Sequence, residues 1–156
     1  MRTELSAGMS MLAFATVADL PVRDVARVSV DTPMWQVVQE MKTKNRGCVL
    51  VIEETGALVG IFTERDLLNR VDHSDVLWSH ATVGDLMTPM PMVIHGDDSL
   101  AEAMRRLTQG RRRHLPIVDD RGRVVGLMSI RDILSYIAGK FPEELMNLPP
   151  DPSHEA

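Results

Sequence analysis

The sequence lacks three features that would restrict its class: a second cysteine, a long apolar run and an excess of positive charge. Cys48 is the single cysteine in 156 residues, so no internal disulfide can form, which favours a reducing compartment. No stretch approaches the roughly 18 consecutive apolar residues of a membrane-spanning helix. The first residues also lack the basic-then-apolar layout of a secretory signal. We therefore expect a cytoplasmic protein with no membrane partner.

The shortage of positive charge bears on the class of ligand. The chain has 17 Lys and Arg residues against 22 Asp and Glu residues, a net charge of -5. Nucleic-acid-binding proteins need a wide basic surface to displace counterions, so we expect no nucleic-acid partner. The dense basic feature is the run Arg111-Arg112-Arg113-His114. Such a short run suits one small anion better than a polymer.

What the sequence does have is an internal repeat without gaps. Gly60 matches Gly126, 66 residues further on, and Asp31 matches Asp97 at the same offset. The runs that begin at these glycines, 60–68 and 126–134, keep glycine, hydroxyl, arginine and aspartate in register. Duplicated units can serve packing alone. Because polar residues match as well as apolar ones, we favour a shared binding site.

The repeat predicts the domain organisation and the fold class. We expect an N-terminal extension over 1–15, a first repeat over 16–74, a linker over 75–81, a second repeat over 82–139 and a tail over 140–156. In each repeat the pattern predicts strand, helix, strand, strand, helix, which is an α/β (α+β) fold. An apolar sheet face in each copy needs cover. The two copies are therefore expected to pack sheet to sheet about a pseudo-twofold axis, with two equivalent clefts between them.

Local signals place the elements. Ser99 and Glu102 have the spacing of a capping box, and Thr32 is predicted to cap a helix whose first residue is Pro33. The predicted strands are 49–52 and 58–62 in the first copy, and 92–94, 115–118 and 124–128 in the second. Helices are predicted from Ser99 to Gly110, after Thr63, and over about 130–138.

Over about residues 16–138 the chain resembles the CBS (cystathionine β-synthase) domain family. The matching motifs are Asp85-Leu86-Met87-Thr88, Arg113-His114-Leu115-Pro116-Ile117-Val118-Asp119, and the glycine, hydroxyl, aspartate run that closes each repeat. The resemblance implies a Bateman module, which is a tandem CBS pair. Such pairs bind AMP, ATP, S-adenosylmethionine or similar ligands and usually dimerise into a flat disc. The end of the chain, Phe141 to Pro150, resembles the tail of small stand-alone bacterial members.

Two pairs of hydroxyl and carboxylate residues are the candidate ribose site. Thr63 and Asp66, like Ser129 and Asp132, lie three residues apart at a helix start, near its unpaired amides. A carboxylate there can accept hydrogen bonds from both vicinal hydroxyls of a ribose, and such charge-assisted bonds are roughly twice as strong as neutral ones. The same spacing occurs in ordinary helix caps. Its repetition in register after a strand end favours the sugar site.

Basic residues are the candidate phosphate ligands, because the planar fork of arginine matches phosphate oxygens. The resemblance places such residues just before the second strand of a repeat. The first copy has Gly47 and Cys48 where the second has Arg113 and His114, so the two clefts are expected to be unequal. The candidates are Arg113, His114, Arg131, Arg65 and Arg46.

Other polar and glycyl positions carry weaker signals. Gly60 and Gly126 would let a base or a backbone approach closely, or they mark strand bulges. Cys48 is predicted to be a small buried residue at a strand start. The histidines show no spacing with acidic or thiol partners typical of a metal site, so none is predicted. These histidines are His73, His80 and His95.

Together these features predict a regulatory module without catalytic activity or a catalytic cofactor. A ligand in the clefts would change the orientation of the halves, provided that it binds the two arrangements with different affinity. The expected partners are an adenosyl ligand, a second copy of the chain and an unidentified effector protein. The alternative is a scaffold protein that binds no ligand. No nucleophile with an adjacent base is evident, which disfavours an enzyme.

Overall fold

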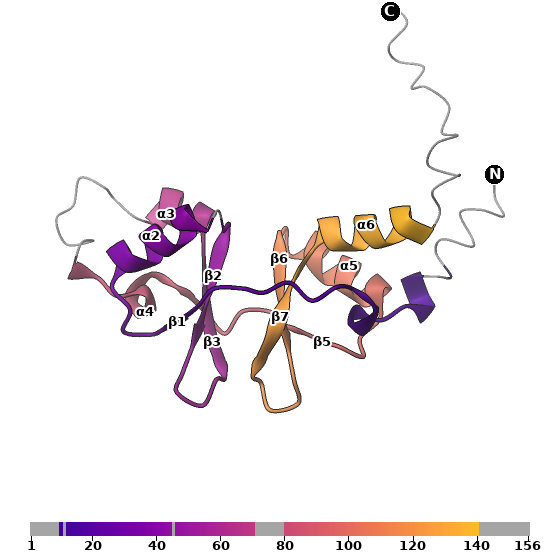
Figure 1. The fold of residues 1–156 in the computed structure, drawn as a ribbon, viewed down its shortest axis with the longest axis horizontal. Coiled ribbons are helices and arrows are strands. Elements are labelled where there is room, and N and C mark those ends of the chain that lie inside the picture. The colour runs from indigo at the N-terminus through magenta and orange to yellow at the C-terminus, as the bar shows by residue number, and fades with distance from the viewer. Residues whose placement is uncertain (1–9, 11, 45, 71–79, 141–156) are drawn as a thin grey trace, which may run out of the picture.

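The structure, a computed structural model, describes residues 10, 12–44, 46–70 and 80–140. Two sheets, with strand orders β1-β2-β3-β4 and β5-β6-β7, stand side by side with helices on their outer sides (Figure 1). This mixed α/β architecture confirms the predicted fold class. Most of the predicted N-terminal extension, the linker and the C-terminal tail lie outside the described residues, as does His73.

Both halves follow the predicted order of elements. In the first, β1 (Arg27–Ser29), α2 (Met34–Thr43), β2 (Cys48–Ile52), β3 (Leu58–Thr63) and α3 (Glu64–Arg70) follow one another. In the second they are β5 (Ile94–His95), α5 (Leu100–Gln109), β6 (His114–Val118), β7 (Val124–Ser129) and α6 (Ile130–Lys140). Strands β1 and β2 pair in parallel, as do β5 and β6, while each hairpin is antiparallel. The parallel pairs require a crossover, which α2 and α5 provide.

Two predicted boundaries are wrong. Helix α2 begins at Met34 with Pro33 in the N-cap position, so Thr32 is not the cap. The extended backbone of Pro33, with ψ of 140°, keeps that residue outside the helix. Strand β5 covers Ile94–His95 rather than 92–94, because the ladder to β6 includes only these two residues.

The predicted capping box at α5 forms on one side only. The Ser99 hydroxyl accepts a hydrogen bond from the Glu102 amide at 3.1 Å. The Glu102 carboxylate does not reach back, because Arg105 and Arg106 both bind it at 2.6 Å. Hydrogen bonds from Arg105 and then Arg106 lower the pKa of Glu102 to about 2. Two cations one turn away are stronger partners than a neutral amide.

The repeats exchange their first segments. The short 3-10 helix η1 (Val17–Asp19) lies against the second half, where the Val17 amide donates to the Asp98 carbonyl at 2.9 Å (Figure 1). Helix α4 (Val83–Leu86), followed by β4 (Thr88–Pro89), lies against the first half, and the Val83 amide donates to the Thr32 carbonyl at 2.9 Å. Val17 and Val83 are buried in the core of the half to which their own repeat does not belong. Each folded half therefore contains residues of both repeats.

The sheets meet through a small apolar cluster between the two main cores. Its buried members are Val25, Cys48, Leu50 and Ile61. The turns of the two hairpins are also joined, since the Leu58 amide donates to the Gly122 carbonyl at 3.0 Å. This contact confirms the predicted packing of the two repeats, and it leaves cavities on either side of the joined sheets.

Candidate functional site

Two cavities lie where the halves meet, and both have lining residues from the two repeats. The larger, cleft A, measures about 430 Å³ and is lined by Thr63 and Asp66 together with the run Arg111 to His114. The smaller, cleft B, measures about 130 Å³ and is lined by Ser129 and Asp132. Small-molecule pockets usually measure about 300–1,000 Å³. Cleft A is within this range and cleft B is below it, so the clefts are unequal.

The predicted hydroxyl and carboxylate pairs are in contact. The Thr63 amide and hydroxyl donate to Asp66 Oδ2 at 2.9 and 2.8 Å. The Ser129 amide and hydroxyl donate to Asp132 Oδ2 at 2.7 and 2.8 Å. Each carboxylate thus uses one oxygen to cap the junction between a strand and a helix. Oδ1 is left for another partner.

The spacing alone does not distinguish a binding site from a cap. Thr16 and Asp19 at η1, and Thr82 and Asp85 at α4, form the same pair of hydrogen bonds as Thr63 and Asp66. Neither of these two pairs is among the residues that line the cavities. Position beside a cleft is therefore what separates Asp66 and Asp132 from the other caps.

The basic run of cleft A, Arg111 to His114, comes from the second repeat, whereas Asp66 and Arg65 come from the first. Arg111 has a positive φ of 47°, which turns the chain out of α5 towards β6. Arg113 and His114 follow and line cleft A, as does Arg65 at the start of α3. Arg131, the equivalent of Arg65, is exposed and is not among the residues that line either cavity.

His114 lines both cavities, at the first position of β6. Burial lowers the pKa of His114, and the charge of Arg113 lowers it further, while Asp132 and Glu64 oppose the shift. The side chain is therefore largely neutral near pH 7. A neutral imidazole can donate one hydrogen bond and accept one.

Cys48 lines cleft B at the start of β2, where it is buried. Burial raises the pKa of its thiol to about 12, although Arg46 lowers it in part and Glu64 raises it. The thiolate is the reactive form of cysteine. Cys48 is therefore a packing residue, as predicted, and is unsuited to act as a nucleophile.

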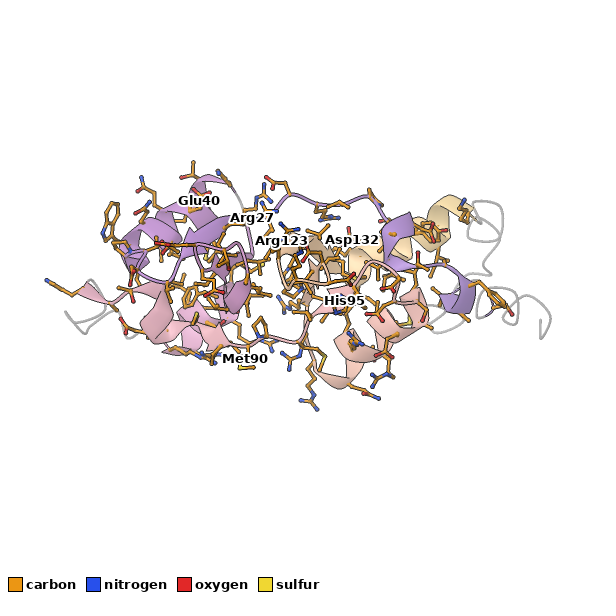
Figure 2. The ribbon with its side chains drawn as sticks, turned by 90° about the horizontal axis from the view of Figure 1, so that it is seen from below. Arg27, Glu40, Met90, His95, Arg123 and Asp132 are labelled. Carbon is orange, nitrogen blue, oxygen red and sulfur yellow. The ribbon has the colours of Figure 1, made fainter. Side chains whose placement is uncertain are left out.

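Cleft B is crossed by an ion pair that the sequence analysis missed. Arg23 Nε lies 2.5 Å from Asp132 Oδ1, and Asp132 is buried with 4% of its side chain exposed. Arg46, the predicted phosphate ligand of the first copy, also lines cleft B, but its guanidinium donates to the Asp24 carbonyl. Segment 23–25 runs along one side of the molecule and the 88–91 segment along the other, as Arg27 and Met90 indicate in Figure 2. In the same view, Asp132 lies near the middle, where the halves meet.

Gly60 and Gly126 allow other segments of the chain to pack directly against strands β3 and β7. Neither is among the residues that line the cavities. A Cβ at Gly60 would lie 2.1 Å from Met87 Sδ, and one at Gly126 would lie 2.6 Å from Val22 Cγ1. A register shift lies next to each glycine in its hairpin, so the predicted bulges are present beside them.

Two properties of the described residues bear on other functions. They contain no group of three or more His, Cys, Asp or Glu side chains that could hold a metal ion. In the described part of the chain, no helix combines the length and apolar character that crossing a membrane requires.

Comparison with known proteins identifies the family. The family model of the CBS domain matches residues 17–73 and 83–139, one match for each repeat. The chain belongs to the CBS domain family. The tandem CBS pair predicted from the motifs is thereby confirmed.

The chain is similar to several CBS proteins. CBS domain-containing protein CBSX3, mitochondrial, of Arabidopsis thaliana is 32% identical over 124 residues, which cover 77% of this chain and 60% of that protein. Arabinose 5-phosphate isomerase KpsF of Escherichia coli is 32% identical over 74% of this chain. The chain spans 35% of KpsF and 22% of the Arabidopsis protein CBSCBSPB2, so it matches only part of these relatives.

Solved structures of CBS proteins share the fold. The CBS-domain containing protein ATU1752 from Agrobacterium tumefaciens has a TM-score of 0.68 and 30% identity, and the match covers 78% of this chain and 97% of that one. CBSX2 of Arabidopsis thaliana in complex with AMP has a TM-score of 0.70 and 26% identity, covering 80% and 97%. A CBS pair of the same fold thus binds an adenosyl ligand.

Proposed function

We propose that this CBS pair is a regulatory, non-catalytic module that binds an adenine nucleotide in cleft A. The observation that carries the proposal is that Asp66 and the run Arg111 to His114 line one cavity of about 430 Å³. A ribose needs an acceptor for two vicinal hydroxyls and a phosphate needs cationic donors. Cleft A supplies both, and the complex of CBSX2 with AMP supports the ligand class.

The sugar would bind at Asp66 Oδ1. This oxygen lies 3.2 Å from Arg70 Nε, one helical turn further along α3, where the Arg70 side chain is 44% exposed. An exposed ion pair of this kind contributes little, typically below about 1 kcal/mol. A ribose can therefore take the place of Arg70 at small cost, while Oδ2 keeps its bonds to Thr63.

The charges of cleft A favour an anionic ligand. Four arginines line it, against two carboxylates, those of Glu64 and Asp66. The arginines are Arg65, Arg111, Arg112 and Arg113. The phosphates of AMP or ATP complement this lining, whereas the sulfonium of S-adenosylmethionine adds a further cation to it.

Calorimetric titration of the chain with AMP, ATP and S-adenosylmethionine tests this function. We expect both nucleotides to bind more tightly than S-adenosylmethionine, and their affinity to fall as salt screens the arginines. Failure of all three ligands to bind at millimolar concentration, or to raise the unfolding temperature, would favour the scaffold alternative, since a ligand at 100 times its Kd adds about 2.7 kcal/mol of stability.

Nucleotide binding is expected to draw a proton onto His114. Burial keeps its pKa low in the unliganded protein, whereas a phosphate dianion placed beside Arg113 and His114 would raise that pKa. The charges facing His114 are those of Arg113, Asp132, Glu64 and Arg23. Proton uptake is therefore expected at pH values between the lowered pKa of unliganded His114 and its raised pKa in the complex, and it is lost at higher pH.

Titrations with AMP in buffers of different ionisation enthalpy measure this uptake. His114→Gln is the matched variant, because the ionisation of AMP itself is the same in both proteins. We expect the variant to take up fewer protons than the wild type. Equal uptake would show that His114 does not contact the phosphate.

Homodimerisation and an effector protein stay predictions. Leu68 on α3 and Leu134 on α6 are equivalent in the two repeats, and they are exposed by 79% and 54%. The exposure of these two leucines at equivalent positions supports their burial against a second copy of the chain, as in the disc expected for CBS pairs.

A further inference from the structure

The segments that line the two clefts differ in sequence at equivalent positions, and one of these differences changes the ion pairs available to the aspartates. After η1 the chain continues with Val22-Arg23-Asp24, and after α4 it continues with Thr88-Pro89-Met90, 66 residues further on. Arg23 therefore stands where the second repeat has Pro89. Proline has neither a charge nor a side-chain donor, so this segment offers no ion-pair partner to Asp66 in cleft A.

In cleft B, Arg23 engages the oxygen that a ribose would need. Its Nε lies 2.5 Å from Asp132 Oδ1, while Ser129 binds Oδ2 through its amide and hydroxyl. Both carboxylate oxygens thus have partners within the chain. Asp132 is 4% exposed, whereas the side chain of Asp66 is 13% exposed.

The ion pair of cleft B is also harder to displace than its counterpart. Asp66 pairs with Arg70 on its own helix, at 3.2 Å and towards solvent. Arg23 instead reaches Asp132 from a different segment. Its own side chain is 58% exposed, so it is the burial of Asp132, at 4% exposed, that distinguishes this pair. A buried carboxylate that loses its ion-pair partner is destabilised unless another group replaces that partner. A ligand in cleft B would have to offset this destabilisation.

The remaining lining of cleft B offers little compensation. Arg46 is turned to the Asp24 carbonyl and lies 3.8 Å from Asp24 Oδ2. Gly47 stands where cleft A has Arg113. The volume of about 130 Å³ is below the usual size of a ligand pocket.

We propose that Arg23 acts as an internal occupant of cleft B, holding Asp132 in place of a ribose, so that each chain binds one adenine nucleotide, in cleft A. This inference rests on the proposed role of the aspartates in sugar binding. Cleft B is then a latent site. Removal of the Arg23 guanidinium would expose Asp132 Oδ1 to the ribose of a second nucleotide and release space beside Arg46 for its phosphate.

The number of AMP molecules bound per chain, measured by equilibrium dialysis, tests the proposal. We expect one for the wild type and two for Arg23→Ala, with the second lost again in the double variant Arg23→Ala, Asp132→Asn. Arg27→Ala is the control, because Arg27 pairs with Asp24 at 3.2 Å and is not among the residues that line the cavities. This control should bind one molecule. Arg23→Met, which keeps the apolar length of the side chain but has no donor for Asp132, replaces the alanine variant, with the same expected result, if that protein does not fold by circular dichroism.

The outcomes separate this inference from the function of cleft A. Two molecules bound to the wild type, or one bound to folded Arg23→Ala, would overturn the role of Arg23 and leave cleft A standing. If the wild type binds no AMP and Arg23→Ala binds one molecule, the role of Arg23 stands and nucleotide binding in cleft A is rejected. No binding to either protein would overturn both.

Discussion

Replacing Asp66 by asparagine is expected to raise the Kd for AMP by about 10- to 100-fold. Hydrogen bonds to a charged partner contribute about 1.5–3 kcal/mol, and each 1.4 kcal/mol is a factor of ten. Asparagine has nearly the same shape but lacks the charge, and one of its two terminal atoms is a donor. It can cap Thr63 or accept from a ribose, but it cannot do both as a carboxylate does. Calorimetric titration with AMP measures the change.

Asp85→Asn is the matched control for this substitution. Asp85 caps α4 through the amide and hydroxyl of Thr82, at 2.9 and 3.0 Å, with the geometry that Asp66 has with Thr63. It is not among the residues that line either cleft. Both variants lose a charged cap, and only Asp66→Asn is expected to lose nucleotide affinity. Equal Kd values for Asp66→Asn and the wild type would reject Asp66 as the ribose ligand.

The sequence predicted the fold because the repeat is strict and its elements have strong local signals. The offset of 66 residues identified the two halves, and the short gaps between predicted strands 49–52 and 58–62, and between 115–118 and 124–128, defined the hairpins. What the spacing could not show is which segments of the two copies meet. Asp66 faces the basic run of the other repeat because the two sheets pack against each other, and Val17 is buried in the other half because the first segments are exchanged. This arrangement depends on contacts between segments about 80 residues apart, such as that of Val17 with Asp98.

The candidate site was predictable in kind, and Gly47 and Cys48 in place of Arg113 and His114 also predicted unequal clefts, but the ion pair of cleft B was not predicted. The motif that identified Asp66 and Asp132 also describes Asp19 and Asp85, which are simple helix caps. Alignment of the two copies at the same offset also sets Arg23 against Pro89, which is a second sequence signal for the difference between the clefts. The ion pair itself follows from the distance between Arg23 and Asp132 in the fold.

The exchange of segments has a consequence for unfolding. Val83 of the second repeat is buried in the core that contains Phe62, and Val17 of the first repeat is buried in the core that contains Met128. Neither half can unfold alone without removing a buried segment from the other. We therefore expect a single cooperative transition for the whole pair, as is usual for chains near this size.

Phe62→Ala is expected to destabilise this whole unit by about 3–5 kcal/mol, because Phe62 is fully buried and its removal leaves a cavity. At roughly 2–4 °C per kcal/mol, the unfolding temperature falls by about 10 °C. Met128→Ala, at the equivalent position of the other core, is expected to cost about 2–5 kcal/mol. Lys42→Ala, at an exposed position of α2, is expected to change stability by less than about 0.5 kcal/mol. Scanning calorimetry and chemical denaturation measure these values. If Phe62→Ala shifts only part of the transition and leaves a second step unchanged, the exchanged segments do not couple the two halves. A ligand bound between the halves could not then stabilise both of them together.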